Sequence, residues 1–260
     1  MENSIFITGA ASGIGRATAL LFAQKGWFVG LFDLNEEGLE SLCSEIGQDK
    51  ACYMKTDVTA IDSIRKAARF FAGKTGNRIS ALFNSAGVLY MGPHENIDIK
   101  KQKKTVDINI TGPLNTIEAC LPFLKRVANS RIISMSSASA AYGIPELAVY
   151  SASKHFIKGL TEALNIEFEP HDIHVCDIMV SYVQTPMTLD ADIKATSLVK
   201  NKTAVMPRDV ARMVWKACRK KKVHWKMGMD FKLTLFVMWA FPFACRFLIK
   251  RKTFSGQHGD

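Results

Sequence analysis

The sequence lacks the features of several protein classes. Its six cysteines are scattered and form no C-x-x-C pair, which favours buried thiols in a reducing compartment over disulfides or a metal site. No basic segment with a long apolar run opens the chain, because Met1–Ser4 leads straight into a strand-like run. We therefore expect no signal peptide and a cytoplasmic protein. Before residue 185 there is no internal repeat, low-complexity segment or Pro/Gly-rich linker.

Most of the chain also lacks an excess of charge. The net charge is +10, but residues 216–252 hold eleven Lys or Arg and one Asp, while the remainder holds 23 residues of each sign. A nucleic-acid-binding surface over the whole body would need a basic excess there, so we expect none. The basic C-terminal stretch needs its own explanation.

Apolar runs and helical patterns alternate along the chain. With 260 residues, 48% of them hydrophobic, the chain can form one large globular domain. The alternation predicts an α/β fold with a doubly wound, mostly parallel sheet covered on both faces. Strands are expected at 4–8, 27–33, 51–58, 79–84, 132–135, 173–180 and 222–225. Helices are expected at 14–25, from 36 onward, at 61–72, over 100–127 in one or two pieces, at 149–168 and at 207–218.

Glycines gather between the first expected strand and the first expected helix. Gly9, Gly13 and Gly15 follow the spacing G-x-x-x-G-x-G, with Ser12 and Ile14 among them. Such glycines let the backbone turn tightly and approach a pyrophosphate, whose charge a helix N-terminus favours. In this strand–turn–helix setting, these five residues are predicted to bind a dinucleotide.

A carboxylate then indicates which dinucleotide. Asp33 ends the second strand, 18 residues after the last glycine of the turn. It can accept hydrogen bonds from both ribose hydroxyls and would repel a 2′-phosphate, and neither Ser12 nor Leu34 is basic. The sequence therefore predicts NAD rather than NADP. At the end of the third strand, Asp57 and Val58 could cover the adenine, although a role for Asp57 as a helix cap explains it nearly as well.

Tyr150 and Lys154 lie four residues apart in an expected helix and therefore share one face. A phenol has a pKa of about 10 and is a poor base at neutral pH. A nearby ammonium and a positive nicotinamide ring both favour the phenolate. Tyr150 is thus a candidate general base for an alcohol proton and a general acid in reverse. Ser136 or Ser137 would hydrogen-bond the substrate oxygen, and position alone does not choose between them.

With Asn84-Ser85-Ala86-Gly87 after the fourth strand, roughly residues 4–185 resemble the short-chain dehydrogenase/reductase family. The resemblance implies a single Rossmann domain with a seven-stranded parallel sheet and hydride transfer to nicotinamide. It rests on the glycine turn, the N-x-A-G run, Asn109 in the long helix, Ser137 thirteen residues before Tyr150, and the Tyr150/Lys154 pair.

The resemblance also implies residue roles. Asn84–Gly87 would support the central sheet and line the adenosine site, and the thirteen-residue interval favours Ser137 over Ser136. Lys154 would also bind the nicotinamide ribose. Asn109 would hold a water in a proton relay, with local bending of a helix as the alternative.

After the sixth strand the family usually has Pro-Gly followed by a Thr. This chain has Val180-Ser181 instead, which leaves the local backbone in question. By resemblance, Thr185 contacts the nicotinamide carboxamide and Val183 packs on its ring. His171 and His174 form an H-x-x-H pair, but without a third ligand no metal site is expected.

The domain is expected to cover residues 1–225, with a substrate lid at 186–206, and an apolar and basic extension follows at 226–260. Thirteen uncharged residues, 233–245, are too few for a spanning helix, which needs about 20. Two interpretations stay open: residues 219–252 dock on an anionic membrane surface, or the tail packs on the chain's own pocket or a partner subunit. An apolar tail near the site suggests a lipophilic alcohol or ketone, such as a steroid, retinoid or lipid.

The leading hypothesis is an NAD-dependent oxidoreductase that interconverts an alcohol and a ketone or aldehyde. The alternatives are a catalytically silent NAD-binding regulator, a membrane-surface protein whose tail is the functional part, and an epimerase or dehydratase of the same fold. The resemblance further implies a homodimer or homotetramer formed through the helices at 100–127 and 149–168.

Overall fold

A seven-stranded parallel sheet forms the centre of the molecule, with strand order β3-β2-β1-β4-β5-β6-β7. The computed structural model describes residues 3–191, 193–200 and 205–253. The predicted α/β class and doubly wound sheet are confirmed. The strands are β1 Ser4–Thr8, β2 Phe28–Asp33, β3 Ala51–Lys55, β4 Ala81–Asn84, β5 Ser130–Met135, β6 Ile173–Met179 and β7 His224–Lys226.

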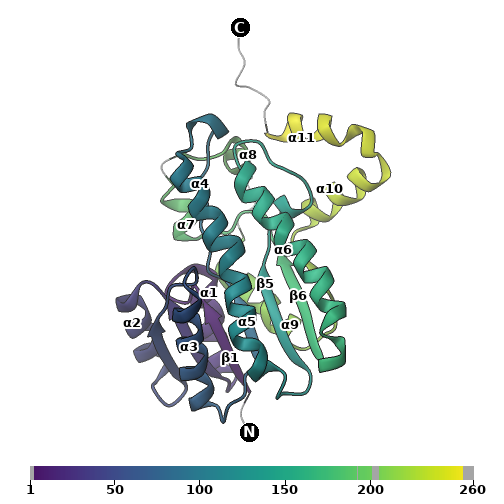
Figure 1. Cartoon of the computed structure of the whole chain (residues 1–260). Helices are drawn as coiled ribbons and strands as arrows, with labels where there is room; N and C mark the ends of the chain where they lie inside the picture. The colour runs from purple at the N-terminus through teal and green to yellow at the C-terminus, as the bar shows by residue number, and fades with distance from the viewer. Residues whose placement is uncertain (1–2, 192, 201–204, 254–260) are drawn as a thin grey trace.

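Helices cover both faces of this sheet (Figure 1). On one face α1, α2 and α9 bury side chains such as Phe22, Leu39 and Val210 against the strands. On the other face α3, α5 and α6 pack through side chains such as Ile64 and Ile117. The larger helices of the body are α1 Gly13–Gln24, α2 Glu36–Ile46, α3 Ile61–Lys74, α4 Ile99–Val106, α5 Gly112–Leu124, α6 Ala148–Glu167 and α9 Pro207–Ala217.

The strand order reverses between β1 and β4, because the chain leaves the β1 edge for β2 and β3 and then returns. In open parallel sheets, ligands bind in the crevice beyond the carboxyl ends of the strands at such a switch point. The glycine turn after β1 and Asn84–Gly87 after β4 both lie there.

The long helix expected over residues 100–127 is broken into α4, a π-helical segment at Asp107–Thr111 and α5. A π segment carries an extra residue per turn and is frequent at functional sites. Pro113 lies in the first turn of α5, where its missing N–H is tolerated. The break turns buried Asn109 toward the loop after β4.

Six predicted strands differ from the structure at their ends, and two of these differences bear on the site and on the domain boundary. The third strand was expected to reach residue 58 but ends at Lys55, so Asp57 and Val58 lie in the following loop. The Thr59 N–H and hydroxyl both donate to Asp57 Oδ1, and these local bonds replace the strand ladder. The seventh strand, expected at 222–225, is His224–Lys226, one residue beyond the expected domain end.

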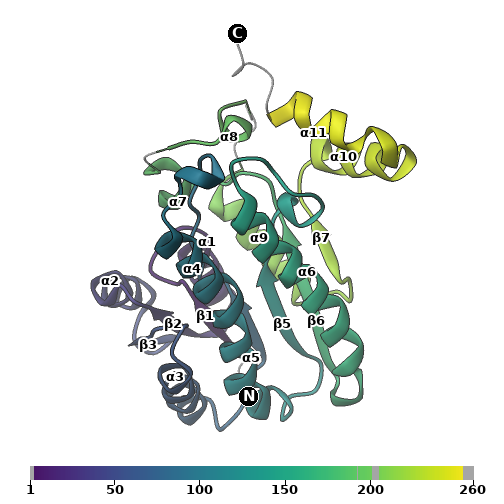
Figure 2. The same cartoon turned by 45° about the horizontal axis from the view of Figure 1, so that its top comes forward.

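The lid region and the C-terminal extension, which both follow β6, form the end of the molecule that lies above the strand ends (Figures 1 and 2). The lid region contains two short helices, α7 Pro186–Leu189 and α8 Thr196–Lys200, while residues 192 and 201–204 lie outside the described part. The extension forms α10 Met229–Ala240, a 3₁₀ turn at Pro242–Ala244 and α11 Cys245–Thr253. Among the described residues, no helix combines the length and apolarity needed to cross a membrane.

Candidate active site

The glycine turn has the backbone that a close ligand contact requires. Gly9 and Gly13 have φ of +67° and +53°, a region that favours glycine. A Cβ on Gly9 would lie 2.8 Å from the Ala86 backbone, and one on Gly15 would lie 2.0 Å from the Gly9 carbonyl oxygen. Gly15 therefore lets α1 pack against the turn without lining the cavity itself, unlike Gly9, Ser12, Gly13 and Ile14.

Asp33 lies at the end of β2 on the same cavity wall as the glycine turn. Its carboxylate accepts a hydrogen bond from the Ala11 N–H at 3.1 Å and another from the Asn35 N–H at 3.1 Å. These two bonds fix the carboxylate beside the turn. Asp57 and Val58 also line this end, although the Asp57 side chain is engaged by Thr59 in a local turn.

Asn84 is buried beneath the cavity and does not line it. Its amide contacts Ser134 Oγ at 3.3 Å, and its carbonyl oxygen accepts a hydrogen bond from the Thr116 hydroxyl. The next residues turn upward, and the Ala86 N–H donates to Thr8 Oγ1 at 3.2 Å. Asn84 thus ties β4 to β5 and α5, and this brings Ala86 and Gly87 to the cavity wall.

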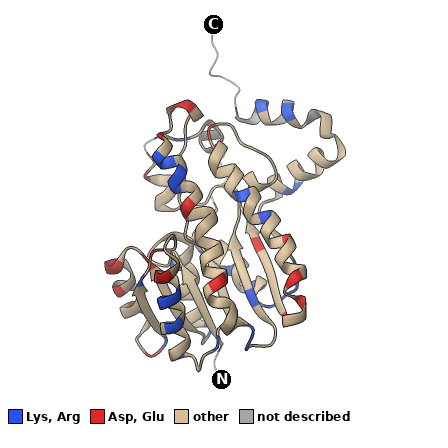
Figure 3. Ribbon diagram, viewed as in Figure 1, with Lys and Arg blue, Asp and Glu red and all other residues tan. Residues whose placement is uncertain are grey.

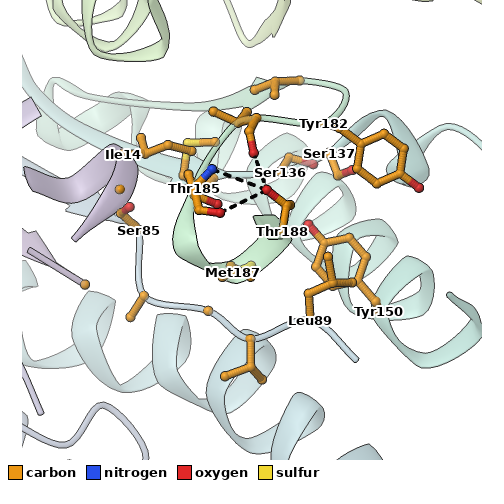
Figure 4. A pocket seen from close by; sticks show the side chains of 18 of the residues that line it. Ile14, Ser85, Leu89, Ser136, Ser137, Tyr150, Tyr182, Thr185, Met187 and Thr188 are labelled. Carbon is orange, nitrogen blue, oxygen red and sulfur yellow. Dashed lines mark hydrogen bonds between the residues drawn. The ribbon is translucent and has the colours of Figure 1, made fainter. Parts of the chain in front are cut away.

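Tyr150 and Lys154 project from α6 toward the end of β5. Lys154 Nζ lies 5.4 Å from the Tyr150 ring centroid and donates to the Met135 carbonyl oxygen at 2.9 Å. Tyr150 lines the cavity, whereas Lys154 is buried behind it. Ser137 hydrogen-bonds the Tyr150 side chain, while Ser136 Oγ is buried with no protein partner among the described residues. Geometry therefore favours Ser137, and Figure 4 shows it near Tyr150.

Burial governs the ionisation of this pair. It raises the pKa of Tyr150 to about 12, and the hydrogen bond with Ser137 offsets part of that rise. It also lowers the pKa of Lys154 to about 8, so the ammonium is still the main form at neutral pH. The protein alone therefore favours a neutral phenol, and the phenolate needs a further positive charge.

Asn109 binds the loop after β4. It accepts a hydrogen bond from the Val88 N–H at 2.9 Å and donates to the Val88 carbonyl oxygen at 3.0 Å. Its amide also donates to Ser153 Oγ at 3.2 Å, and that hydroxyl donates to the Tyr150 carbonyl oxygen at 2.7 Å. Asn109 thus joins the π segment, the cofactor loop and α6. Ser153 was not predicted, since a buried serine two residues after another serine carries no distinctive pattern.

The backbone after β6 keeps strand-like hydrogen bonding, although Val180-Ser181 replace the Pro-Gly that is usual in the family. The Ala138 N–H donates to the Val180 carbonyl oxygen at 2.8 Å, so pairing with the β5 side continues past Met179. Val183 and Thr185 both line the cavity, and the glycine turn approaches Thr185 closely enough that a Cβ on Gly13 would lie 3.1 Å from its methyl group. The residues expected at the nicotinamide end thus lie beside the glycine turn.

Side chains that the sequence did not single out connect the expected lid segment to the rest of the cavity wall. The Glu146 carboxylate accepts hydrogen bonds from the Thr196 N–H and hydroxyl, at the first residue of α8. The Tyr182 hydroxyl lies 2.6 Å from Ser197 Oγ, and both residues line the cavity. Thr188 Oγ1 lies 2.7 Å from the Val183 carbonyl oxygen, as the dashed lines of Figure 4 show. No short motif marks these contacts, and that between Glu146 and Thr196 joins residues 50 apart in the sequence.

One cavity of about 920 Å³ joins all these walls. Its glycine turn has the close backbone approach that a pyrophosphate requires, and the fixed Asp33 carboxylate is placed to accept ribose hydroxyls. The residues therefore fit a nicotinamide dinucleotide, with room beyond it next to Tyr150. Within the described residues, no group of three His, Cys, Asp or Glu side chains is arranged for a metal ion, and all six cysteines are free thiols.

Comparison with known proteins agrees with this geometry. The family model for short chain dehydrogenases matches residues 3–195. A cyclohexanol dehydrogenase of Acinetobacter sp. (strain SE19) is 32% identical over 197 residues, which are 75% of this chain and 77% of the relative.

Two solved structures share the fold. A short chain dehydrogenase/reductase of Burkholderia phymatum in complex with NAD superposes with a TM-score of 0.82 at 21% identity, covering 93% of this chain and 94% of the other. An alcohol dehydrogenase of Thermococcus sibiricus complexed with 5-hydroxy-NADP superposes with a TM-score of 0.77 at 22% identity, covering 87% and 95%. Together with the matched family model, the glycine turn and the Tyr150–Lys154 pair, these similarities mean that the chain belongs to the short-chain dehydrogenase/reductase family of oxidoreductases.

Proposed function

We propose that the chain interconverts a lipophilic alcohol and its ketone or aldehyde, with NAD as the hydride carrier. The observation that carries this proposal is the shape of one cavity. A glycine turn and a fixed carboxylate line one end, and Tyr150 with Ser137 lines the other. A pure dinucleotide binder would have no need of a buried phenol paired with an ammonium.

In this proposal Tyr150 takes the proton of the alcohol hydroxyl, and it returns a proton to the carbonyl oxygen in the reverse direction. Ser137 hydrogen-bonds the substrate oxygen from the opposite side. Bound NAD would accept the hydride of the alcohol carbon, and its positive ring would favour the Tyr150 phenolate. Lys154 adds a second positive charge behind the phenol.

NAD is preferred over NADP because of charge. The Asp33 carboxylate is anchored by two backbone N–H groups, so it cannot readily turn away from a 2′-phosphate. No basic side chain is present among the described residues that line the cavity. A 2′-phosphate would therefore meet a fixed negative charge without compensation.

The substrate is expected to be apolar because of the walls around Tyr150. Leu89, Ile144, Leu147 and Phe231 line this end with Tyr142 and Tyr182. The charged lining residues that the structure describes are Asp33 and Asp57. Asp33 ends β2 and Asp57 follows β3, both at the glycine-turn end. A polar polyol would lose its hydration here with few groups to replace it.

A panel of alcohols tests the function. Purified protein with NAD is offered cyclohexanol, a long-chain secondary alcohol, a hydroxysteroid, retinol and, as the polar control, a tetritol. We expect release of reduced nicotinamide, measured by its near-ultraviolet absorbance, with the apolar members and little with the tetritol. Product formation without net reduced cofactor would instead indicate an epimerase or dehydratase. Absence of turnover with every member, in both directions, would contradict an oxidoreductase of lipophilic alcohols.

We also propose that two or four copies associate through α4–α5 and α6, as the family resemblance implies. Multi-angle light scattering after size exclusion measures the mass directly. A monomer at all concentrations would contradict this part of the proposal without affecting the reaction.

A further inference from the structure

The last described helices form an arm beside the catalytic body. We define the C-terminal arm as residues 228–253, which comprise α10, the 3₁₀ turn and α11. It leaves the sheet after β7 and lies at the end of the molecule where the lid is (Figures 1 and 2). α10 packs on the body through Phe231, which joins a buried cluster with Ala138, Ala140 and Met179. α11 contacts lid helix α8.

The outer surface of the arm is unusually apolar. Trp239 and Phe243 expose 80% and 85% of their surface. Apolar side chains occur on all sides of α10, and such helices are normally buried. A contiguous exposed apolar patch of this kind marks an interaction surface. The other exposed members are Leu233, Phe236, Phe241 and Phe247.

The basic residues of the C-terminal arm indicate which kind of partner its exposed apolar surface would bind. The arm contains five Lys or Arg and one acidic residue, Asp230. Lys232, Arg246 and Lys250 are exposed, and Figure 3 shows the blue segments of the arm. A second copy of the arm would bring like charges together, which opposes self-association. An anionic surface with an apolar interior satisfies both properties at once, because basic side chains meet its head groups while aromatic rings enter its boundary.

We propose that the C-terminal arm docks on an anionic lipid bilayer. The aromatic side chains around Trp239 and Phe243 lie at the boundary between head groups and acyl chains, and Lys232, Arg246 and Lys250 contact lipid phosphates. Such docking is peripheral and reversible, and no described helix combines the length and the apolarity needed to span the bilayer.

The arm also forms part of the cavity wall. Phe231 and Thr234 of α10 line the cavity, while Leu233 and Phe236 of the same helix are exposed. Docking would therefore place one wall of the substrate site at the bilayer surface, where lipophilic alcohols concentrate. This supply route rests on the proposed function, whereas lipid binding itself does not.

Vesicle sedimentation of the full chain tests the docking without substrate or cofactor. The vesicles are phosphatidylcholine alone, or phosphatidylcholine and phosphatidylglycerol in a two-to-one ratio. We expect affinity for the anionic vesicles to be greater by about tenfold or more, and to fall as salt is raised. Equal sedimentation with both kinds of vesicle, or none with either, would overturn the proposal.

Matched variants identify the surface. Trp239→Ser with Phe243→Ser should reduce binding to the anionic vesicles by about tenfold, while Trp239→Phe with Phe243→Leu should retain it. Arg246→Glu with Lys250→Glu should lose the preference for anionic lipid, while Arg246→Lys with Lys250→Arg should keep it. Full binding by both disruptive pairs would reject the arm as the surface.

Two further readouts separate the remaining outcomes. If light scattering shows a dimer that the serine pair dissociates, and vesicles do not bind, a second copy covers the patch and the proposal is wrong. Turnover of a water-soluble alcohol is measured in parallel. Vesicle binding without turnover would contradict only the proposed function, and turnover without vesicle binding would contradict only the docking.

Discussion

The two ends of the cavity are built differently. The glycine-turn end is made of backbone and short side chains at the ends of β1, β2 and β4, where Gly9, Asp33 and Ala86 lie within a few residues of a buried strand. The end beyond Tyr150 is walled by segments after β6, which are the lid and the first turns of α10. One end is fixed by the sheet, and the other by side-chain contacts between distant segments.

This difference separates two kinds of specificity. At the sheet-fixed end, bonds such as that from the Ala11 N–H to Asp33 join the turn after β1 to the end of the neighbouring strand β2. At the lid end, two contacts, Glu146 with Thr196 and Tyr182 with Ser197, hold α8 in place. We therefore expect substitutions at the first end to change the cofactor, and substitutions at the second to change the substrate. Tyr150 lies between them and should affect the reaction itself.

The largest effect is expected for Tyr150→Phe. The variant keeps the ring and its packing but removes the group that exchanges a proton with the substrate. We expect kcat to fall by about a thousandfold or more, in line with the loss of a general acid/base. NAD binding, followed by quenching of intrinsic fluorescence, should change by less than about twofold.

Lys154→Met is the companion variant for this prediction. It removes the charge behind the phenol and keeps a side chain of similar length in a buried position. It should lower kcat. The rate of alcohol oxidation should also begin to increase only at higher pH, because burial already raises the Tyr150 pKa and loss of the nearby ammonium would raise it further.

Turnover within tenfold of the wild type for Tyr150→Phe would refute Tyr150 as the acid/base group.

The glycine-turn end of the cavity could be predicted from the sequence better than the lid end. The glycine spacing, Asp33 at the end of β2 and the Tyr150–Lys154 interval are local patterns. The structure brings Gly9, Gly13, Asp33 and Tyr150 to one cavity and buries Lys154 behind it. The broken helix at Asn109 was anticipated only as one or two pieces, because no short pattern marks a π segment whose Asn109 exchanges hydrogen bonds with Val88, 21 residues away.

The lid end could not be predicted in the same way. Residues 186–206 were expected as a lid because they lack a strong period. No pattern within the segment shows that Thr196 bonds Glu146, 50 residues earlier, or that Ser197 bonds Tyr182, 15 residues earlier. For the C-terminal extension two interpretations stayed open, because a sequence that is both apolar and basic suits packing on protein and docking on an anionic membrane. The structure places Phe231 in the body and leaves Trp239 exposed, so a single helix has both kinds of surface.

The next largest effect is expected for Asp33→Asn at the sheet-fixed end. The variant retains the shape of the side chain but loses its charge, which weakens hydrogen bonds to the ribose and removes repulsion of a 2′-phosphate. We expect the KM for NAD to rise by about tenfold, and NADP to become a comparable cofactor, in steady-state assays with a fixed alcohol.

The control for this substitution is Glu37→Gln, an equal charge change on exposed surface in α2. It should leave both cofactor constants within about twofold, since exposed charges at a distance are screened. The KM for the alcohol should be unchanged in Asp33→Asn. A parallel change in the alcohol KM would show that the two ends are not independent.

A smaller effect is expected at the root of the C-terminal arm. His224 in β7 lies between two carboxylates, with Nδ1 3.0 Å from Asp177 Oδ1 and Nε2 3.0 Å from Glu162 Oε1. Both partners raise the pKa of His224, Asp177 first, although partial burial opposes them. A raised folded-state pKa stabilises the fold fully below the unfolded pKa of about 6.5, and that contribution is lost as pH rises through the folded pKa.

His224→Gln should therefore lower the free energy of unfolding by about 1–3 kcal/mol below pH 6, measured by urea denaturation, and by less above pH 9. Part of the stability lost at low pH comes from Asp177, because its buried carboxylate would no longer have the charged His224 imidazole beside it. His171→Gln, on exposed surface, is the control and should show no such pH dependence. An equal loss at both pH values would mean that packing, and not the charge of His224, stabilises β7.

The smallest effect is expected for Tyr182→Phe at the lid end. The substitution removes the hydroxyl that lies 2.6 Å from Ser197 Oγ and keeps the ring in the cavity wall. One hydrogen bond contributes about 0.5–1.5 kcal/mol, so the KM for the alcohol should rise by about two- to tenfold while the KM for NAD stays constant. Ser197→Ala should have the same effect, and the double variant should add little, because both substitutions break one bond. Additive effects would show that the two hydroxyls act separately, and an equal rise in the KM for NAD would mean that the lid also holds the cofactor end.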